Sequence, residues 1–155
     1  MAAIRAIALD VDGVLTDGGF WWGEGGEEFK KFSFLDVMGI SLGTKAGLVF
    51  ALISGEDSPL VDRFAKKMGI RHVHKGCKDK GQALKAFALA TGIPLEAIAF
   101  MGDDVNDQAA LAQAGLAVAP ANAHPSIKAC AHRVTHAKGG HGAVRELIDS
   151  LLPQD

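Results

Sequence analysis

Two aspartates spaced two residues apart, Asp10 and Asp12, are the residues of this sequence best placed to do chemistry. They follow an apolar run over residues 4–9 that only Arg5 interrupts, and Gly13 comes directly after them. This pattern predicts a buried strand that ends in an acidic loop. Residues i and i+2 of an extended segment project to the same side. Both carboxylates can therefore address one small volume at the carboxyl end of a strand, where ligands bind in open α/β sheets.

Two carboxylates this close repel each other unless one is protonated or a cation lies between them. A hard cation with oxygen ligands would hold one carboxylate, and a second carboxylate with a shifted pKa could transfer protons. Asp-Gly is also common turn chemistry, so the motif alone is equally compatible with a simple turn. The rest of the chain has to decide between these two interpretations.

Polar groups also follow three other predicted strands of the chain. They are Ser54-Gly55-Glu56 after residues 48–53, a basic loop over 75–80 after 70–74, and Gly102-Asp103-Asp104-Val105-Asn106-Asp107 after 98–101. The carboxyl ends of parallel strands lie along one edge of a sheet, so these groups can converge. Carboxylates and a cation make a metal site, and a hydroxyl, loop amides and a lysine make a phosphate site. The combination predicts phosphoryl-transfer chemistry, which depends on positioning and charge neutralisation.

Each of these pieces also has a plainer interpretation. Ser54 would be a turn residue, Lys80 a solvated lysine at a helix start, and the Asp103-Asp104 pair a helix N-cap. Their joint occurrence in this order favours a site.

Helices are predicted between the strands, over residues 36–46, 59–68, 83–91, 108–114, 124–129 and 143–152. Asp36 and Ser58 are the expected N-caps, and Gly47 and Gly69 the expected stops. Further strands are expected over 116–119 and, at the edge of the sheet, over 133–134. The strands are continuous apolar runs that alternate with helices. This favours an α/β fold in which a parallel sheet is covered on both faces, giving three Rossmann-like layers.

An aromatic, glycine-rich segment over residues 18–33 interrupts this alternation and predicts a β-hairpin after the first strand. It contains both tryptophans of the chain, Trp21 and Trp22. An isolated two-stranded hairpin is marginal in water. A hairpin this apolar should therefore pack on its own domain or on a neighbouring subunit.

Length and composition predict one globular domain over residues 1–155, with no separate cap domain. The formal net charge of −2 gives no basic surface for nucleic acid. The two cysteines, Cys77 and Cys130, have no metal-like spacing and favour a reducing compartment. We expect no membrane span and no signal peptide, because the amino end leads directly into a strand. A cytoplasmic location is the resulting expectation.

The order of these motifs resembles the haloacid dehalogenase (HAD) superfamily of phosphatases. The resemblance rests on Asp-x-Asp-Gly at residues 10–13, Ser54-Gly55, Lys80 and Gly-Asp-Asp-x-Asn-Asp at 102–107. The missing cap, the hairpin, and the segments 15–18 and 139–146 are similar to a small capless branch. That branch contains phosphatases of 3-deoxy-D-manno-octulosonate 8-phosphate and of nine-carbon 2-keto-3-deoxy sugar acids.

The resemblance implies a role for each motif residue. Asp10 would be the nucleophile that becomes an aspartyl phosphate, and Asp12 the general acid and base. Mg²⁺ would be held by Asp10, the backbone carbonyl of Asp12, and Asp103. The phosphate would be bound by Ser54, Gly55 and one lysine, Lys80 fitting the family pattern better than Lys78; Asp104 and Asp107 would be supporting groups.

The branch also implies a homotetramer in which hairpins meet across subunits. We expect the closing segment, residues 138–145, to cover a neighbouring active site. Lys138 or Arg145 is then a candidate for binding the substrate carboxylate, although Arg145 is equally compatible with an ordinary helix-surface charge. Family members have an arginine near Lys138, which this chain lacks.

Glu56 decides the predicted substrate. Octulosonate phosphatases typically have arginine after this glycine, and Glu56 instead is similar to the nine-carbon members. Lys67, one helix later, would supply a countercharge for the substrate carboxylate. These residues favour 2-keto-3-deoxynononate 9-phosphate, followed by N-acetylneuraminate 9-phosphate and octulosonate 8-phosphate. Two interpretations of other classes are a receiver-like signalling domain and a catalytically idle assembly module.

Overall fold

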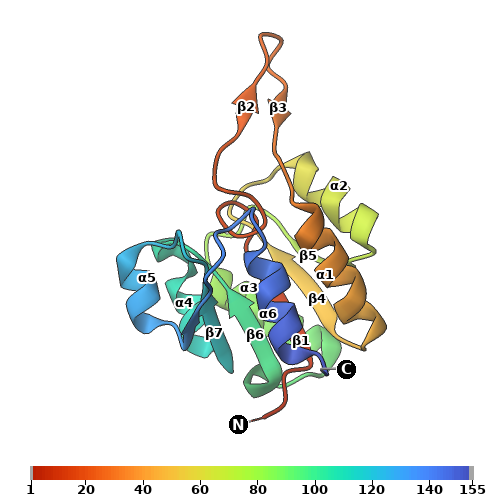
Figure 1. Cartoon of the computed structure of the whole chain (residues 1–155), viewed down its shortest axis with the longest axis vertical. Helices are drawn as coiled ribbons and strands as arrows, with labels where there is room; N and C mark the ends of the chain where they lie inside the picture. Colours follow the sequence, from red (N-terminus) through yellow and green to blue (C-terminus); the bar gives the residue numbers. More distant parts are fainter. Residues whose placement is uncertain (1, 154–155) are drawn as a thin grey trace.

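The computed structural model describes residues 2–153 and is built around one six-stranded parallel sheet (Figure 1). The strand order is β5-β4-β1-β6-β7-β8, and every neighbouring pair is parallel. The strands are β1 (Ala6–Leu9), β4 (Val49–Ile53), β5 (His72–His74), β6 (Ile98–Met101), β7 (Leu116–Ala119) and β8 (Arg133–Val134). The predicted α/β class is confirmed, and the strand that precedes Asp10 lies inside the sheet between β4 and β6.

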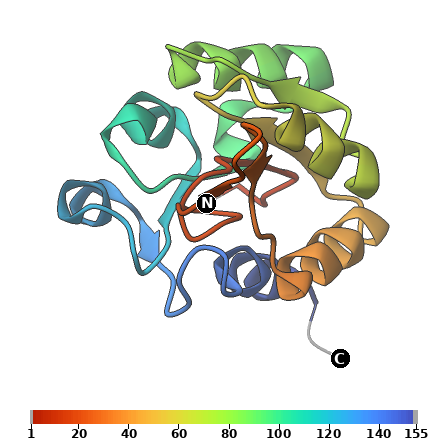
Figure 2. The same cartoon turned by 90° about the horizontal axis from the view of Figure 1, so that it is seen from above.

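Helices cover both faces of the sheet. One face carries α1 (Phe34–Lys45), α2 (Pro59–Met68) and α6 (Ala143–Leu151); the other carries α3 (Lys80–Thr91), α4 (Gln108–Gln113) and α5 (Pro125–Cys130). Short 3-10 turns lie at Leu95–Ala97 (η1) and Val105–Asp107 (η2). Because side chains alternate along a strand, β1 gives Ile7 and Leu9 to the first layer and Ala6 and Ala8 to the second. Seen from above, α1 and α6 lie side by side (Figure 2).

Two helices begin at least two residues earlier than predicted. Helix α1 begins at Phe34 with Ser33 as its N-cap, so the prediction of Asp36 as the cap is wrong. Asp36 lies in the first turn, only 1% exposed, and its Oδ1 accepts a hydrogen bond from the backbone N–H of Arg145 at 3.0 Å. Asp36 therefore supplies a hydrogen-bond acceptor to the first turn of α6 and does not cap its own helix. Helix α3 begins at Lys80, earlier than expected, because Asp79 caps it.

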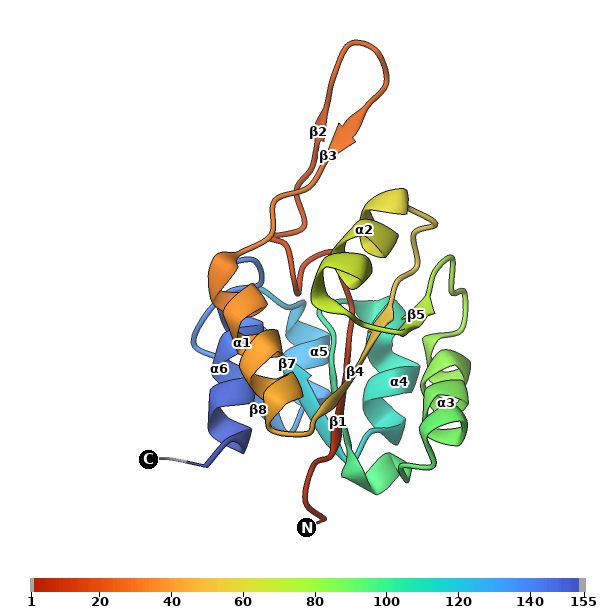
Figure 3. The same cartoon turned by 90° about the vertical axis from the view of Figure 1, so that its right-hand side faces the viewer.

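The hairpin stands clear of the sheet and helices (Figures 1 and 3). Its paired strands are short, β2 (Trp21–Trp22) and β3 (Glu28–Phe29). The aromatic side chains at its end are exposed, Trp22 by 73% and Phe29 by 54%. In this chain the end of the hairpin therefore does not bury its aromatic side chains on its own domain.

Within residues 2–153, no helix combines the length and the apolar character that crossing a membrane would require.

Candidate active site

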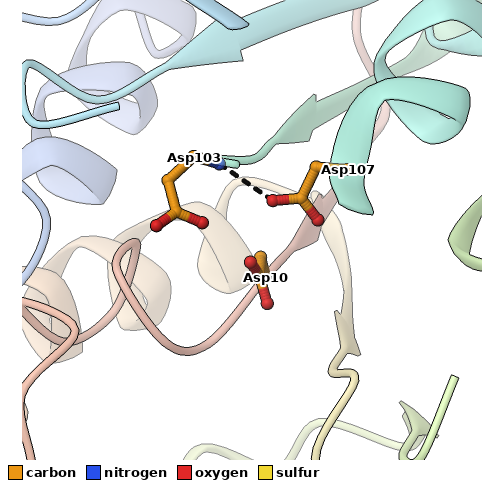
Figure 4. A group of neighbouring side chains, drawn as sticks. All are labelled: Asp10, Asp103 and Asp107. Carbon is orange, nitrogen blue, oxygen red and sulfur yellow. Dashed lines mark hydrogen bonds between the residues drawn. The ribbon is translucent and has the colours of Figure 1, made fainter. Parts of the chain in front are cut away.

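Three carboxylates converge beyond the carboxyl ends of β1 and β6. Asp10, Asp103 and Asp107 each offer an oxygen within 4.8 Å of the others, and Figure 4 shows them facing a shared space. The two strands are adjacent in the sheet, and the backbone N–H of Asp10 donates to the carbonyl of Met101 at 3.1 Å. Strand pairing thus brings together the acidic residues that the sequence places far apart.

Asp107 organises the second acidic loop. Its Oδ2 accepts from the backbone N–H of Asp103 at 2.9 Å and of Asp104 at 3.4 Å, and its Oδ1 accepts from Lys80 at 2.8 Å. Both oxygens of this fully buried side chain are therefore occupied. Such an arrangement suits a supporting group better than a ligand, and it leaves Asp10 and Asp103 as the carboxylates open to a cation.

Lys80 is the cation that the cluster already contains. Its side chain is 2% exposed, and its Nζ lies 3.1 Å from Asp10 Oδ1 and 2.8 Å from Asp107 Oδ1. Burial lowers the pKa of Lys80, but the charges of Asp10 and Asp107 outweigh it and raise the pKa above its ordinary value. Lys80 is thus a fixed positive charge. Lys78 is exposed, so of the two lysines the structure brings Lys80 to the site.

The electrostatics of the cluster fit a divalent cation. Burial raises the pKa of Asp10 well above 3.8, with the charge of Asp107 adding to the effect, and burial raises the pKa of Asp103 to about 6. Three carboxylates and one ammonium group leave two negative charges uncompensated. Carboxylate oxygens are the ligands that Mg²⁺ prefers, and the ion's charge matches this excess.

Gly13 gives Asp103 its place beside Asp10. Its φ is +85°, and a Cβ on this residue would lie 1.8 Å from Asp103 Oδ2. Only glycine fits, because any side chain would both strain the backbone and displace the carboxylate. The glycine of the Asp-x-Asp-Gly motif is thus required by the approach of the two acidic loops.

A cavity of about 480 Å³ opens above the cluster. Most of the predicted site residues line this cavity, together with Gly18 and Asn106, which were not predicted. The lining residues are Asp10, Asp12, Gly18, Gly55, Glu56, Lys80, Asp103, Asp104 and Asn106. Asn106 lies inside the second acidic motif and was not among the predicted site residues. Ser54 is fully buried beneath the loop, where its Oγ accepts from the backbone N–H of Glu56 at 3.1 Å. In this chain Ser54 supports the loop.

The structure does not bring Lys67 or Arg145 to this cavity. Lys67 lines a second cavity between α1 and α2. The Arg145 Nε donates to Asp149 at 3.0 Å, one turn later on α6. Lys138 is exposed. Within this chain, Arg145 is a charge on the surface of helix α6 that pairs with Asp149.

The closing segment packs on the acidic loop of its own chain. Its expected role as a cover for a neighbouring active site stays a prediction. The backbone N–H of Gly140 donates to the carbonyl of Val14 at 3.2 Å. Asn122 joins the two segments: its Nδ2 donates to the carbonyl of Gly13 at 3.1 Å, and its Oδ1 accepts from Gly139 N–H at 2.7 Å. No local pattern in the sequence points to Asn122, because its contacts join segments that only the tertiary structure brings together.

Lys30, like Asn106 and Asn122, was not predicted from the sequence. It follows β3 directly, and its Nζ lies 2.5 Å from Asp12 Oδ1. Asp12 lines the cavity on the side of the hairpin, and Lys30 fixes one of its oxygens.

Comparisons with known proteins identify the family of this chain. The family described as haloacid dehalogenase-like hydrolase matches residues 49–147. The chain is 40% identical over 151 residues to the 3-deoxy-D-manno-octulosonate 8-phosphate phosphatase of Yersinia pestis, covering 97% of this chain and 81% of that protein. The crystal structure of the Yersinia pestis enzyme superposes with a TM-score of 0.94, covering 96% of this chain and 80% of that chain.

A second similar structure is the enzyme of the same name from Moraxella catarrhalis, in complex with magnesium, phosphate and the eight-carbon sugar acid. It is 37% identical, with a TM-score of 0.93, and covers 96% of this chain and 86% of that chain. These relatives confirm the resemblance and the phosphatase class predicted from the motifs. The chain belongs to the haloacid dehalogenase-like hydrolases and, within them, is a phosphoric monoester hydrolase.

Proposed function

We propose that this chain is a magnesium-dependent phosphatase of 2-keto-3-deoxy sugar acid phosphates that works through an aspartyl phosphate. The observation that carries the proposal is the Asp10 carboxylate, buried at the floor of the cavity between Lys80 and Asp103 and two residues before Asp12. A nucleophile, a fixed cation, a metal-binding carboxylate and a proton-transferring group are thereby assembled in one place.

Hydrolysis follows in two steps. An oxygen of Asp10 attacks phosphorus, the bond from phosphorus to the substrate oxygen breaks, and Asp12 gives its proton to that departing oxygen. Asp12 then takes a proton from water, whose oxygen attacks the phosphoryl group and releases phosphate and free Asp10. Lys80 stays protonated and neutralises charge on the phosphoryl oxygens. Mg²⁺, held by Asp10, Asp103 and the backbone carbonyl of Asp12, supplies further charge neutralisation.

Two substrates are supported by different observations. Glu56 lines the cavity and is an acceptor where an arginine would be a donor. It can accept hydrogen bonds from sugar hydroxyl groups, which favours the nine-carbon 2-keto-3-deoxynononate 9-phosphate. The names of relatives 40% identical over nearly the whole chain favour 3-deoxy-D-manno-octulosonate 8-phosphate. The argument from Glu56 applies equally to N-acetylneuraminate 9-phosphate.

We also propose that the functional unit is a cytoplasmic homotetramer assembled through the hairpin. The exposed side chains of Trp21, Trp22 and Phe29 support this, because apolar surface of this kind favours burial against another chain. The two thiols, Cys77 and Cys130, are free, which suits a reducing compartment. In the tetramer, Lys138 is the candidate for the substrate carboxylate, since Arg145 is already paired.

The test is magnesium-dependent phosphate release from the eight-carbon and nine-carbon substrates side by side, with Asp10→Asn as the control. Faster turnover of the nine-carbon substrate supports the argument from Glu56, and faster turnover of the eight-carbon substrate supports the argument from the relatives. An Asp10→Asn variant as active as the wild type contradicts the mechanism. If the protein neither turns over a substrate nor binds Mg²⁺, it is a catalytically idle module. If it forms a phosphoenzyme that decays slowly and does not hydrolyse the sugar phosphates, it is a receiver-like domain.

A further inference from the structure

Lys30 is a buried cation on an otherwise exposed element. It belongs to the base of the projecting hairpin, yet its side chain is only 3% exposed. Its Nζ donates to Asp12 Oδ1 at 2.5 Å and lies 3.8 Å from Glu28 Oε2. The same nitrogen lies 5.9 Å from the centre of the Phe20 ring. Both strands of the hairpin thus help to fix this one ammonium group.

A lysine in this position has an energetic cost that only its partners offset. Removing an ammonium group from water is unfavourable unless a carboxylate and further contacts compensate for the lost hydration. Here Asp12 is the nearer carboxylate and Glu28 the more distant one, and the Phe20 ring adds a weak cation–π attraction. Lys30 is therefore held in one place, and its bond fixes Oδ1 of Asp12.

We propose that Lys30 is a positioning residue for proton transfer by Asp12. The inference rests on the proposed function, in which Asp12 protonates the departing substrate oxygen. The bond from Lys30 occupies Oδ1, which leaves Oδ2 as the oxygen of Asp12 that transfers the proton in the cavity that Asp12 lines. In this step the bond from phosphorus to the leaving oxygen breaks, phosphorus bonds to Asp10, and the proton passes from Asp12 to the leaving oxygen. Lys30 keeps its own protons throughout.

The consequence is that the hairpin contributes to the active site of its own chain. This contribution is separate from any contact between subunits, because Lys30 and Asp12 belong to the same chain. A hairpin that shifts or frays would release Oδ1 and leave Asp12 free to rotate. Orientation of a catalytic group matters strongly, since small misplacements cost large factors in rate.

The test compares substrates that differ in their need for an acid. A sugar phosphate leaves as an alkoxide and needs protonation, whereas para-nitrophenyl phosphate leaves as a stable phenolate and needs little. The value of kcat/KM covers only the steps up to departure of the leaving group. For Lys30→Met we expect kcat/KM to fall about 10- to 100-fold with the sugar phosphate and less than about threefold with the aryl phosphate.

The controls separate positioning from folding. Lys31→Met removes the adjacent, exposed lysine and is expected to leave both substrates unaffected. Lys30→Arg keeps a donor for Oδ1 and is expected to restore part of the loss with the sugar phosphate. Thermal unfolding of each variant reports whether the fold is retained.

Four outcomes overturn the inference, and the last of them also overturns the proposed function. An equal loss with both substrates shows that Lys30 acts on the fold or on phosphate binding, and no loss with the sugar phosphate shows that the contact is idle. A Lys30→Arg variant as impaired as Lys30→Met in a folded protein contradicts positioning through a hydrogen bond. If the wild type hydrolyses neither substrate, the proposed function fails, and the inference fails with it.

Discussion

Replacing Asp103 by asparagine is expected to stabilise the metal-free protein and to weaken its metal binding. The change keeps the shape of the side chain beside Gly13 and removes one of three crowded negative charges. Burial raises the pKa of Asp103 from 3.8 to about 6, and the charge of Asp107 contributes to the shift. A shift of about two pKa units corresponds to about 3 kcal/mol. Partial exposure screens this value, so we expect about 1 to 2 kcal/mol near pH 8.

The sign follows from the raised pKa. The pKa of the Asp103 carboxyl is higher in the folded state than in the unfolded state. Its contribution to the free energy of unfolding is therefore fully present below pH 3.8 and is lost as pH rises through about 6. The Asp103→Asn variant does not undergo this loss. The difference in unfolding free energy between variant and wild type is therefore expected to grow between about pH 4 and pH 7.

Urea unfolding with a chelator measures the difference, and the same experiment with millimolar Mg²⁺ measures the metal. A ligand that binds only the native state stabilises it, so Mg²⁺ should raise the stability of the wild type more than that of Asp103→Asn. The matched control is Glu24→Gln, which removes one negative charge from the exposed tip of the hairpin. A stability difference that does not change with pH, or an equal effect of Mg²⁺ on both proteins, would refute the reasoning.

Three further substitutions test other parts of the structure. Gly13→Ala should lower kcat/KM by about 100-fold or more, because its Cβ would displace the Asp103 carboxylate; a magnesium titration of the folded variant should show weakened binding. Lys80→Met should destabilise the metal-free protein by about 3 kcal/mol in urea unfolding, because two buried carboxylates lose their counter-ion; unchanged stability would contradict this role. Burial raises the pKa of Asp36 to about 6, so the contribution of Asp36 to wild-type stability is lost as pH rises through that value. The Asp36→Asn variant does not undergo this loss, so in thermal unfolding it should become more stable relative to the wild type by about 1 to 3 kcal/mol by about pH 8. A stability difference that does not change with pH would contradict this prediction.

The main features of the fold could be predicted because they depend on local pattern. Continuous apolar runs identified the strands, and their alternation with helices determined a parallel sheet and hence the shared edge where Asp10 and Asp103 meet. Helix α2 was correct at both ends, since Ser58 caps it and Gly69 ends it with a φ of +70°. In each of these cases the signal lies within a few residues of the feature.

The errors arise where distant segments decide the outcome. Ser33 and Asp36 are both good N-cap types, and the sequence cannot choose between them locally. The choice is made by Arg145 at the start of α6, whose backbone N–H needs an acceptor that Asp36 provides. The roles of Lys30 and Asn122 were missed for the same reason, because each depends on a contact between segments far apart in the chain.

The packing of the closing segment on the acidic loop determines when the active site can be completed during synthesis. Asp10 leaves the ribosome long before Gly139 and Gly140, which lie against the loop that follows it. Asn122 can join the loop to Gly139 only after both have emerged. A nascent chain therefore carries Asp10 and Asp12 before the contacts that order their loop can form, and recovery of activity during refolding is expected to report the docking of the closing segment.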